Sequence, residues 1–318
     1  WQEIAASQTD LFRSDMAALR VLPPDAYVRV QDSIGETGEA IAALIGAGLA
    51  YRVDVASDAE PAATTQLGDV YYDVAAAEAA SDWNMGDVSG YTAAEMEAAF
   101  LEFGGDPDRA GKRGAFDPLL WRSARAGEPA FESAVGLGRP GWHIECSVIA
   151  TQTLGAPISV QGGGRDLRFP HHELSAAHAM SLLSVDSHGT PADFARAYTH
   201  AGLIAYDGTK MSKSLGNLVL VSRLTAAGVA PGAIRLALLS HHYRSDWEWT
   251  DEELEGSSAR LQEWRERAAR SSDDTVAPEL NTVVQRMRDA IADDLDTPRV
   301  VAIVDEWASM PPAAGDAD

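Results

Sequence analysis

The sequence has one cysteine, little positive charge and no long hydrophobic run. The single cysteine, Cys146, excludes an internal disulfide bond and suits a reducing compartment, so we expect a cytoplasmic protein. No run of about 18 apolar residues occurs, and we therefore expect no membrane span. The first residues, Trp1 to Ile4, lack an initiator methionine and the basic and apolar stretches of a signal peptide. We expect the chain to begin inside a longer protein.

Positive charge is scarce, since 25 Lys and Arg stand against 48 Asp and Glu and give a net charge of −23. Proteins that bind nucleic acid normally carry a basic stripe, because an acidic surface repels the phosphate backbone. We therefore expect no nucleic-acid partner. Taken by itself, the charge is more simply explained as a solvated acidic surface. The length of 318 residues supports a substantial core in one large domain or in two to three small ones.

Apolar spacing and turn residues predict an alternation of helices and strands. A first helical stretch ends at the prolines 23 and 24, and further helices are expected over residues 31–49, 93–100, 144–154 and 171–183. Strands are expected over residues 69–74, 119–121 and 158–161. The alternation after residue 116 predicts a parallel α/β sheet with a ligand crevice at the ends of its strands.

The last part of the chain is predicted to be helical. Thr250 and Glu253 have the spacing of a capping box at the start of a helix. A later helix keeps one face apolar over several turns, which predicts packing in a core or bundle. The residues of this face are Leu280, Val284, Met287, Ile291 and Leu295. We expect the end of the chain, residues 311–318, to be disordered.

The strongest local signal is the pentapeptide Lys-Met-Ser-Lys-Ser at residues 210–214. Two lysines and two hydroxyls on a loop flanked by glycines can hold a polyphosphate, and the lysine charge offsets the negative charge of leaving pyrophosphate. A short Lys/Ser stretch is by default a solvated turn. The complete string, however, resembles a signature of class I aminoacyl-tRNA synthetases. That resemblance implies catalytic roles for Lys210, Ser212 and Lys213.

A second signal combines Cys146, within Gly-Trp-His-Ile-Glu-Cys-Ser, with His171, within Phe-Pro-His-His-Glu. Cysteine and histidine are preferred zinc ligands, and a catalytic zinc keeps one position open. A lone cysteine is more often a small buried hydrophobe. Adjacent histidines are often ordinary core or surface groups. The residues alone therefore predict a metal site only weakly.

Residues 138–147, 161–167 and 169–173 together resemble the zinc and nucleotide region of cysteinyl-tRNA synthetases and of the mycothiol-pathway cysteine ligases that descend from them. The resemblance extends from residue 12 to residue 298. It implies an α/β fold: the C-terminal half of a class I synthetase-like Rossmann catalytic domain with an insertion, a stem-contact region and a helical bundle. The implied parts are a helical segment and connective insertion (1–115), the second half of the Rossmann domain (116–205), the KMSKS loop and stem-contact-like region (206–250) and the helical bundle (251–318).

The same resemblance implies one Zn²⁺ per chain, with Cys146 and His171 as two of its ligands and a further cysteine in a segment that this sequence lacks. A thiolate binds zinc better than a hydroxyl does, so the ion would select cysteine over serine. Contacts to the amino acid or the adenylate are implied for Trp142, Gly164, Arg165, Asp166 and Ile204, although family members have serine where Arg165 stands. No His-x-Gly-His motif occurs here, so the implied enzyme needs an additional N-terminal part.

Both related enzymes form cysteinyl-AMP from L-cysteine and ATP, with Mg²⁺ expected to accompany the ATP, and they differ in the acceptor. The synthetases have a glutamate ligand four residues after the zinc histidine, where this chain has Ser175. Residues 102–107, Glu-Phe-Gly-Gly-Asp-Pro, and residues 217–222 resemble the ligases. We therefore expect a monomer that ligates L-cysteine to the amine of 1D-myo-inositol 2-amino-2-deoxy-α-D-glucopyranoside (glucosaminyl-inositol). A cysteinyl-tRNA synthetase fragment and a relative that only binds a nucleotide or a partner remain as alternatives.

Overall fold

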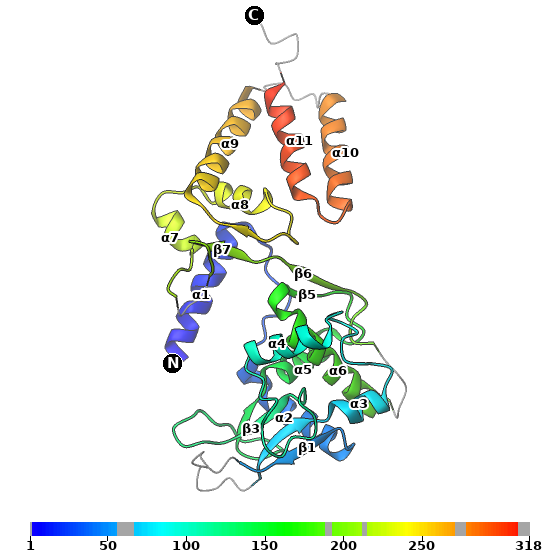
Figure 1. Cartoon of the computed structure of the whole chain (residues 1–318). Helices are drawn as coiled ribbons and strands as arrows, with labels where there is room; N and C mark the ends of the chain where they lie inside the picture. The colour runs from blue at the N-terminus through cyan, green and yellow to red at the C-terminus, as the bar shows by residue number, and fades with distance from the viewer. Residues whose placement is uncertain (1, 56–66, 188–192, 212–214, 271–277, 311–318) are drawn as a thin grey trace, which may run out of the picture. The chain divides into compact units, whose positions relative to one another are not determined.

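The computed structural model describes residues 2–55, 67–187, 193–211, 215–270 and 278–310 (Figure 1). The chain forms two compact units. We call residues 26–200 the central unit, and residues 1–25 together with 201–318 the terminal unit. Within the described ranges, no helix is both long and apolar enough to cross a membrane.

The central unit begins with a 3₁₀ turn and alternates short helices with short strands. Its elements are η1 (Val30–Ser33), α2 (Ile34–Gly46), β1 (Ala50–Val53), β2 (Asp69–Tyr72), α3 (Val74–Ala80), α4 (Ala93–Glu102), β3 (Leu119–Ser123), β4 (Gly138–Pro140), α5 (Trp142–Leu154), β5 (Gln161–Gly164), η2 (Arg165–Leu167), the π-helical turn η3 (Arg168–His172), α6 (Glu173–Asp186) and β6 (Tyr198–Ala201).

Strands β1 to β4 form one antiparallel sheet in the order β1-β2-β3-β4. Because successive side chains of a strand point to opposite faces, Tyr72 and Val70 pack on one face of this sheet while Tyr71 packs on the other. Helices α2, α5 and α6 lie against the first face (Figure 1). The core there contains Ile41, Leu44, Val70, Tyr72, Leu120, Trp121, Ile144 and Val148.

Two glycines explain why β3 and β4 approach so closely. A Cβ on Gly138 would lie 2.2 Å from the carbonyl oxygen of Arg122, and a Cβ on Gly141 would lie 1.9 Å from that of Leu119. No other residue fits at either position. The close approach places the start of α5 directly beside the sheet, and α5 carries two of the predicted site residues.

The parallel pairing expected after residue 116 is found around β5, α6 and β6. Ile158 and Ala195 form a parallel bridge, and the strands that follow them, β5 and β6, are neighbours. The described strand begins at Gln161, so the predicted strand over residues 158–161 lies a few residues too early. The strand predicted over residues 119–121 exists as β3, but it belongs to the antiparallel sheet because its partners are β2 and β4.

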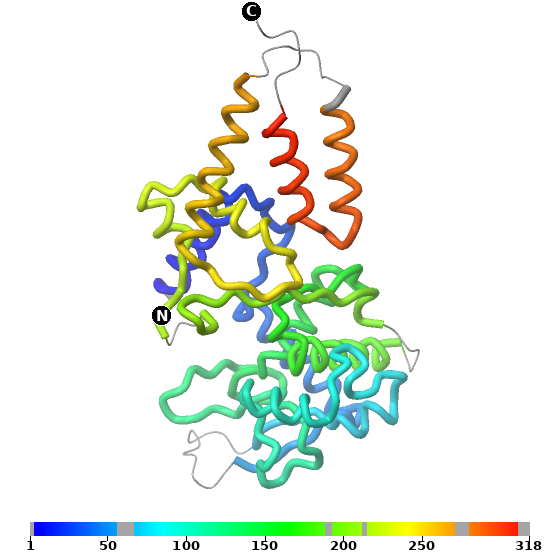
Figure 2. The backbone as a smooth tube through the Cα atoms, turned by 45° about the horizontal axis from the view of Figure 1, so that its top comes forward, coloured from blue at the N-terminus to red at the C-terminus, as the bar shows by residue number. Residues whose placement is uncertain are grey.

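The terminal unit is mainly helical, as predicted for the end of the chain. Its elements are α1 (Gln2–Ala18), β7 (Ile204–Tyr206), β8 (Thr209–Lys210), α7 (Val221–Ala226), α8 (Pro231–Leu239), β9 (Trp247–Glu248), α9 (Asp251–Arg270), α10 (Pro278–Ala292) and α11 (Thr297–Ser309). Figure 2 shows α11, in red, between α9 and α10, and it packs against both. At the start of α9 the Glu253 amide donates to Thr250 Oγ1 at 3.1 Å, so the predicted N-terminal cap is present.

The apolar face of α10 is mostly not in the core, contrary to prediction. Helix α10 packs against α11 through Val283 and Ala290, which lie two turns apart and are 5% and 0% exposed. A helix buries only the stripe that faces its neighbour, so the residues beside that stripe remain in solvent. Of the five residues predicted to be buried, only Met287 packs against this core. The four exposed ones are Leu280 (36%), Val284 (38%), Ile291 (42%) and Leu295 (52%).

Candidate active site

Helix α5 and the π-helical turn η3 bring two predicted site residues, Trp142 and His171, together. Trp142 begins α5, and Cys146 follows one helical turn later. His171 lies in η3, just before α6. Its imidazole stacks on the Trp142 indole with 4.4 Å between ring centroids and 2° between the planes. Trp142 and His171 therefore form one wall, and their roles at an amino-acid pocket stay predictions.

His143 completes this aromatic cluster and was not among the predicted site residues. Its Nδ1 lies 3.1 Å from Nδ1 of His171, and both residues are buried, at 5% and 6% exposure. Burial lowers the pKa of His171 to about 4 and that of His143 well below its usual value. Both imidazoles are therefore neutral near pH 7, and one donates its N–H to the other. A neutral imidazole is the form that binds a metal.

Cys146 is half-buried on α5, and burial together with the neighbouring Glu145 raises the pKa of its thiol. The thiol is therefore protonated near pH 7 unless a cation lies beside it. Sulfur and neutral imidazole are donors that zinc prefers, so Cys146 and His171 fit this ion in type. Among the described residues, no group of three or more His, Cys, Asp or Glu is arranged to hold a metal. A zinc ion here would need a further ligand from elsewhere.

Two buried serines fix α5 against α6. The Ser175 hydroxyl donates to the carbonyl oxygen of His143 at 3.1 Å, and the Ser147 hydroxyl donates to that of Ser175 at 2.8 Å. Both side chains are completely buried. The family resemblance singled out Ser175, because the synthetases have a glutamate at that position. Nothing in the sequence indicated the hydrogen bond from Ser175 to His143. Ser175 thus positions the backbone of His143, next to the aromatic cluster.

The first residue of α6, Glu173, is a second support that the sequence did not reveal. Its carboxylate is fully buried and accepts hydrogen bonds from Trp83 Nε1 at 2.9 Å, from the Ser89 amide at 2.7 Å and from the Val88 amide at 3.2 Å. These bonds tie the segment after α3 to the start of α6. They also satisfy a buried charge that would otherwise be costly. The histidines before Glu173 are held in place as a result.

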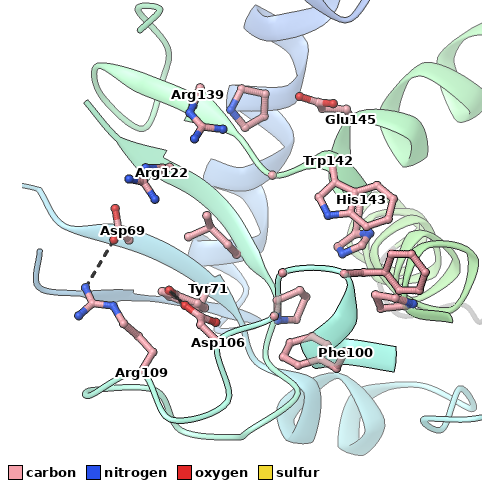
Figure 3. Close-up of a pocket in the computed structure, with 18 of the residues that line it drawn as sticks. Asp69, Tyr71, Phe100, Asp106, Arg109, Arg122, Arg139, Trp142, His143 and Glu145 are labelled. Carbon is pink, nitrogen blue, oxygen red and sulfur yellow. Dashed lines mark hydrogen bonds and ion pairs between the residues drawn. The ribbon is translucent and has the colours of Figure 1, made fainter. Parts of the chain in front are cut away.

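A cavity of about 520 Å³ opens beside Trp142 and His143 (Figure 3). Its walls come from β2, the loop after α4, strands β3 and β4, and the start of α5. Glycines 104 and 105 and Asp106, within the predicted Glu-Phe-Gly-Gly-Asp-Pro motif, line it. A Cβ on Gly105 would lie 2.2 Å from the Phe100 ring, so this glycine allows the loop to close over α4. The motif thus shapes a cavity that reaches the aromatic cluster.

The residues expected to hold the nucleotide lie on both units. Gly164 ends β5, and Arg165 and Asp166 follow in η2, so they stand after a strand as predicted. Ile204 begins β7 of the terminal unit, and Lys210 ends β8. Ser212 and Lys213 lie outside the described residues. The roles of all these residues stay predictions.

A tight hairpin presents Lys210. Strands β7 and β8 pair as Tyr206↔Thr209, with only Asp207 and Gly208 between them. Both have positive φ, 53° and 69°, as a type I′ turn requires. The Asp-Gly dipeptide therefore fixes the direction in which the chain enters the lysine loop. Lys210 itself is exposed.

Comparison with known proteins agrees with this arrangement. Residues 1–259 match the family of tRNA synthetases class I (C) catalytic domain. The L-cysteine:1D-myo-inositol 2-amino-2-deoxy-alpha-D-glucopyranoside ligase of Clavibacter michiganensis is 55% identical over 96% of this chain and 69% of its own length. The ligase of the same name from Micrococcus luteus is 52% identical over 97% of this chain and 69% of its own.

The fold also matches a solved synthetase. Mycobacterium tuberculosis methionyl-tRNA synthetase in complex with methionyl-adenylate aligns with a TM-score of 0.57 over 96% of this chain and 69% of that one, at 14% identity. This likeness supports the class I synthetase fold that the motifs implied. The family match, the fold and the identity to two ligases agree, and the chain belongs to the class I (C) tRNA synthetase catalytic-domain family, in the same group as these cysteine ligases.

Proposed function

We propose that the protein ligates L-cysteine to the amine of glucosaminyl-inositol, a step of mycothiol biosynthesis, and converts ATP to AMP and pyrophosphate. The observation that carries this proposal is the identity of 49–55% to ligases of that name over at least 96% of the chain. Ser175 supports it, because its hydroxyl is bonded to the backbone of α5 where the synthetases have a metal-binding glutamate.

In the first step, a carboxylate oxygen of cysteine attacks the α-phosphorus of ATP. A new P–O bond forms, the bond to the bridging oxygen breaks, and pyrophosphate leaves with its electron pair. Lys210, Ser212 and Lys213 stabilise the charge on this leaving group. Gly164, Arg165, Asp166 and Ile204 hold the adenylate, and Mg²⁺ accompanies the ATP.

In the second step, the amine of the aminosugar attacks the activated carbonyl. The C–N bond of the amide forms, the bond from the carbonyl carbon to the phosphate oxygen breaks, and AMP leaves with that electron pair while the amine loses a proton. Holding amine and carbonyl side by side supplies much of the rate. Trp142 lines the amino-acid pocket in which this carbonyl is presented.

Cys146 and His171 are proposed as two ligands of a zinc ion. A bound zinc ion would be a Lewis acid that prefers a thiolate to a hydroxyl, and it would therefore select cysteine over serine. His143 orients His171 through the bond between their Nδ1 atoms. Trp142 stacks on one face of the His171 ring. We further propose a monomer that works in the cytoplasm and needs no nucleic acid.

The test uses the full-length protein. We expect ATP–pyrophosphate exchange that depends on cysteine and is weak with serine. We then expect glucosaminyl-inositol, and not tRNA, to discharge the cysteinyl-adenylate. Discharge by tRNA instead would establish the synthetase alternative. Absence of exchange in zinc-loaded protein would contradict the proposal and leave a nucleotide-binding relative.

A further inference from the structure

Two arginines stand opposite each other on the wall of the cavity. Arg122 of β3 and Arg139 of β4 are direct cross-strand partners, and both line the cavity (Figure 3). Like charges in such positions destabilise a sheet. One carboxylate, Glu128, compensates for the pair: it accepts from Arg122 at 2.9 and 3.2 Å and from Arg139 at 3.4 Å. Two guanidinium groups therefore share the hydrogen bonds of one carboxylate.

Two carboxylates of the cavity, those of Asp69 and Asp106, are already paired with other cations. Asp69 accepts from Arg125 at 2.9 and 3.0 Å and lies 3.5 Å from Arg109. Asp106 lies 3.0 Å from the Lys112 ammonium and accepts from the Tyr71 hydroxyl at 2.5 Å. These groups form a fixed polar wall.

Arg122 and Arg139 differ from this wall, because their side chains are 37% and 46% exposed. A guanidinium has five N–H donors, and the bonds to Glu128 use at most two on either residue. Each arginine therefore retains donors for a ligand in the cavity.

The remaining lining is apolar and partly aromatic, with Phe100, Leu119, Pro140 and Trp142 among it. A polyhydroxylated ring has the matching character, because its hydroxyls take paired hydrogen bonds from guanidinium groups while its C–H faces pack on apolar surface. The volume of about 520 Å³ lies in the range of small-molecule sites.

The charges around the cavity favour a polyol that carries no phosphate. Four arginines line the cavity, at positions 109, 122, 125 and 139, against three carboxylic residues, Asp69, Asp106 and Glu145. These carboxylates and Glu128, which accepts from Arg122 and Arg139, nearly balance the four arginines. Sites that hold a nucleic-acid backbone are strongly basic.

Resting on the proposed function, we propose that this cavity is the acceptor subsite and binds the sugar and cyclitol rings of the aminosugar, with Arg122 and Arg139 donating to their hydroxyls. Trp142 and His143 belong both to the cavity wall and to the aromatic cluster that contains His171. An aminosugar whose rings lie in the cavity has its amine next to the cysteinyl carbonyl, which lies beside Trp142 in the proposed function. Arg122 and Arg139 are thus specificity-determining residues of the second step.

The experiment compares Arg122→Gln, Arg139→Gln and the double variant in the full-length enzyme. Two rates are measured: cysteine-dependent ATP–pyrophosphate exchange, which needs no acceptor, and ligation at varied glucosaminyl-inositol. We expect the KM for the acceptor to rise about tenfold or more for each single change, because a hydrogen bond from a charged donor is lost. We expect exchange to stay within about twofold, since adenylation precedes acceptor binding.

Arg29→Gln is the matched control. It also lies in the central unit, but it is 70% exposed, pairs with Asp32 and is not part of the cavity. Arg122→Lys keeps the charge and loses the planar fork, so we expect an intermediate KM from it. It also serves as the test if a glutamine variant proves unfolded by circular dichroism.

The possible outcomes separate the two proposals. An unchanged acceptor KM in an active enzyme overturns the acceptor subsite and leaves the proposed function standing. An equal fall of exchange and ligation also overturns it, because the arginines then serve adenylation. If the wild-type enzyme charges tRNA and the variants lose that transfer, the cavity binds RNA. If the wild-type enzyme makes adenylate but does not use the aminosugar, the proposed function itself fails.

Discussion

The Nδ1 atoms of His143 and His171 lie 3.1 Å apart in a buried pair, so a single proton is shared between two neutral rings. If His171 donates from Nδ1, its Nε2 lone pair is available to a metal. If His143 donates instead, Nε2 of His171 carries the proton and cannot bind a metal. His143 therefore sets the tautomer of the proposed zinc ligand.

We predict that His143→Leu weakens zinc binding by about 10- to 100-fold, because His171 loses the partner that orients it and fixes its tautomer. Competition with a chelator measures the affinity in full-length protein. His143→Gln is the matched variant, because its side-chain oxygen still accepts a hydrogen bond, and it should bind zinc more tightly than His143→Leu. Equal zinc affinity in wild type and His143→Leu would show that His143 has no such role.

The sequence predicted the parts of this site that follow from motifs and failed where tertiary packing decides. Trp142 and His171 were singled out on the strength of the family resemblance, and their rings stack, but a shared amino-acid pocket stays a prediction. His143 was overlooked, although it stands beside Trp142, because the sequence does not show which ring faces His171. Likewise, the stripe at Leu280 and Ile291 has the spacing of a buried helix face, but whether such a face is covered depends on how many helices surround it.

We predict that Ser175→Ala lowers the free energy of unfolding by about 1 kcal/mol, because one buried hydrogen bond to the His143 carbonyl is lost. Urea denaturation measures this change. Ser258→Ala is a suitable control, since the Ser258 hydroxyl makes a similar bond to Leu254 but is exposed, and we expect a change below about 0.5 kcal/mol. If Ser175 took part in metal binding, Ser175→Ala would instead lose zinc at wild-type stability.

We predict that Lys210→Ala lowers the rate of cysteine-dependent ATP–pyrophosphate exchange by about 10²- to 10³-fold, as is typical when one group that stabilises developing charge is removed. The KM for cysteine should change little, because the proposed amino-acid pocket lies around Trp142. Lys210→Arg keeps a positive charge at the end of β8 and should retain part of the rate. A raised KM for cysteine with unchanged kcat would place Lys210 in substrate binding.

His178 makes the stability of the fold depend on pH. It is completely buried at the edge of the Tyr72 ring, with 4.6 Å between ring centroids, and neither ring nitrogen has a hydrogen-bond partner among the described residues. Burial lowers its pKa from 6.5 to about 3. Between these two pH values the unfolded chain binds a proton at His178 that the folded chain does not. Stability is therefore lost as the pH falls below 6.5.

Glu145 has the opposite effect on how the stability of the fold depends on pH. Burial raises its pKa from 4.5 to about 7, so the folded chain binds a proton there that the unfolded chain releases. Its contribution to stability is present at low pH and is lost as the pH rises from 4.5 to 7. The pH dependence of the wild-type protein's free energy of unfolding is the sum of the contributions of all such groups. The contribution of His178 therefore has to be measured as a difference between wild type and a variant.

We predict that His178→Leu removes about 2 kcal/mol of the stability loss between pH 7 and pH 5. At pH 5 the solution is about 1.5 pH units below the pKa of His178 in the unfolded chain, and each unit corresponds to about 1.4 kcal/mol. Leucine also replaces an unpartnered polar ring, so the variant should be at least as stable as wild type at pH 7. Urea denaturation at pH 5, 6 and 7 measures both effects. An equal loss of unfolding free energy between pH 7 and pH 5 in the two proteins would contradict this. It would mean that protonated His178 finds a partner in the folded state, and that the packing around Tyr72 opens at low pH.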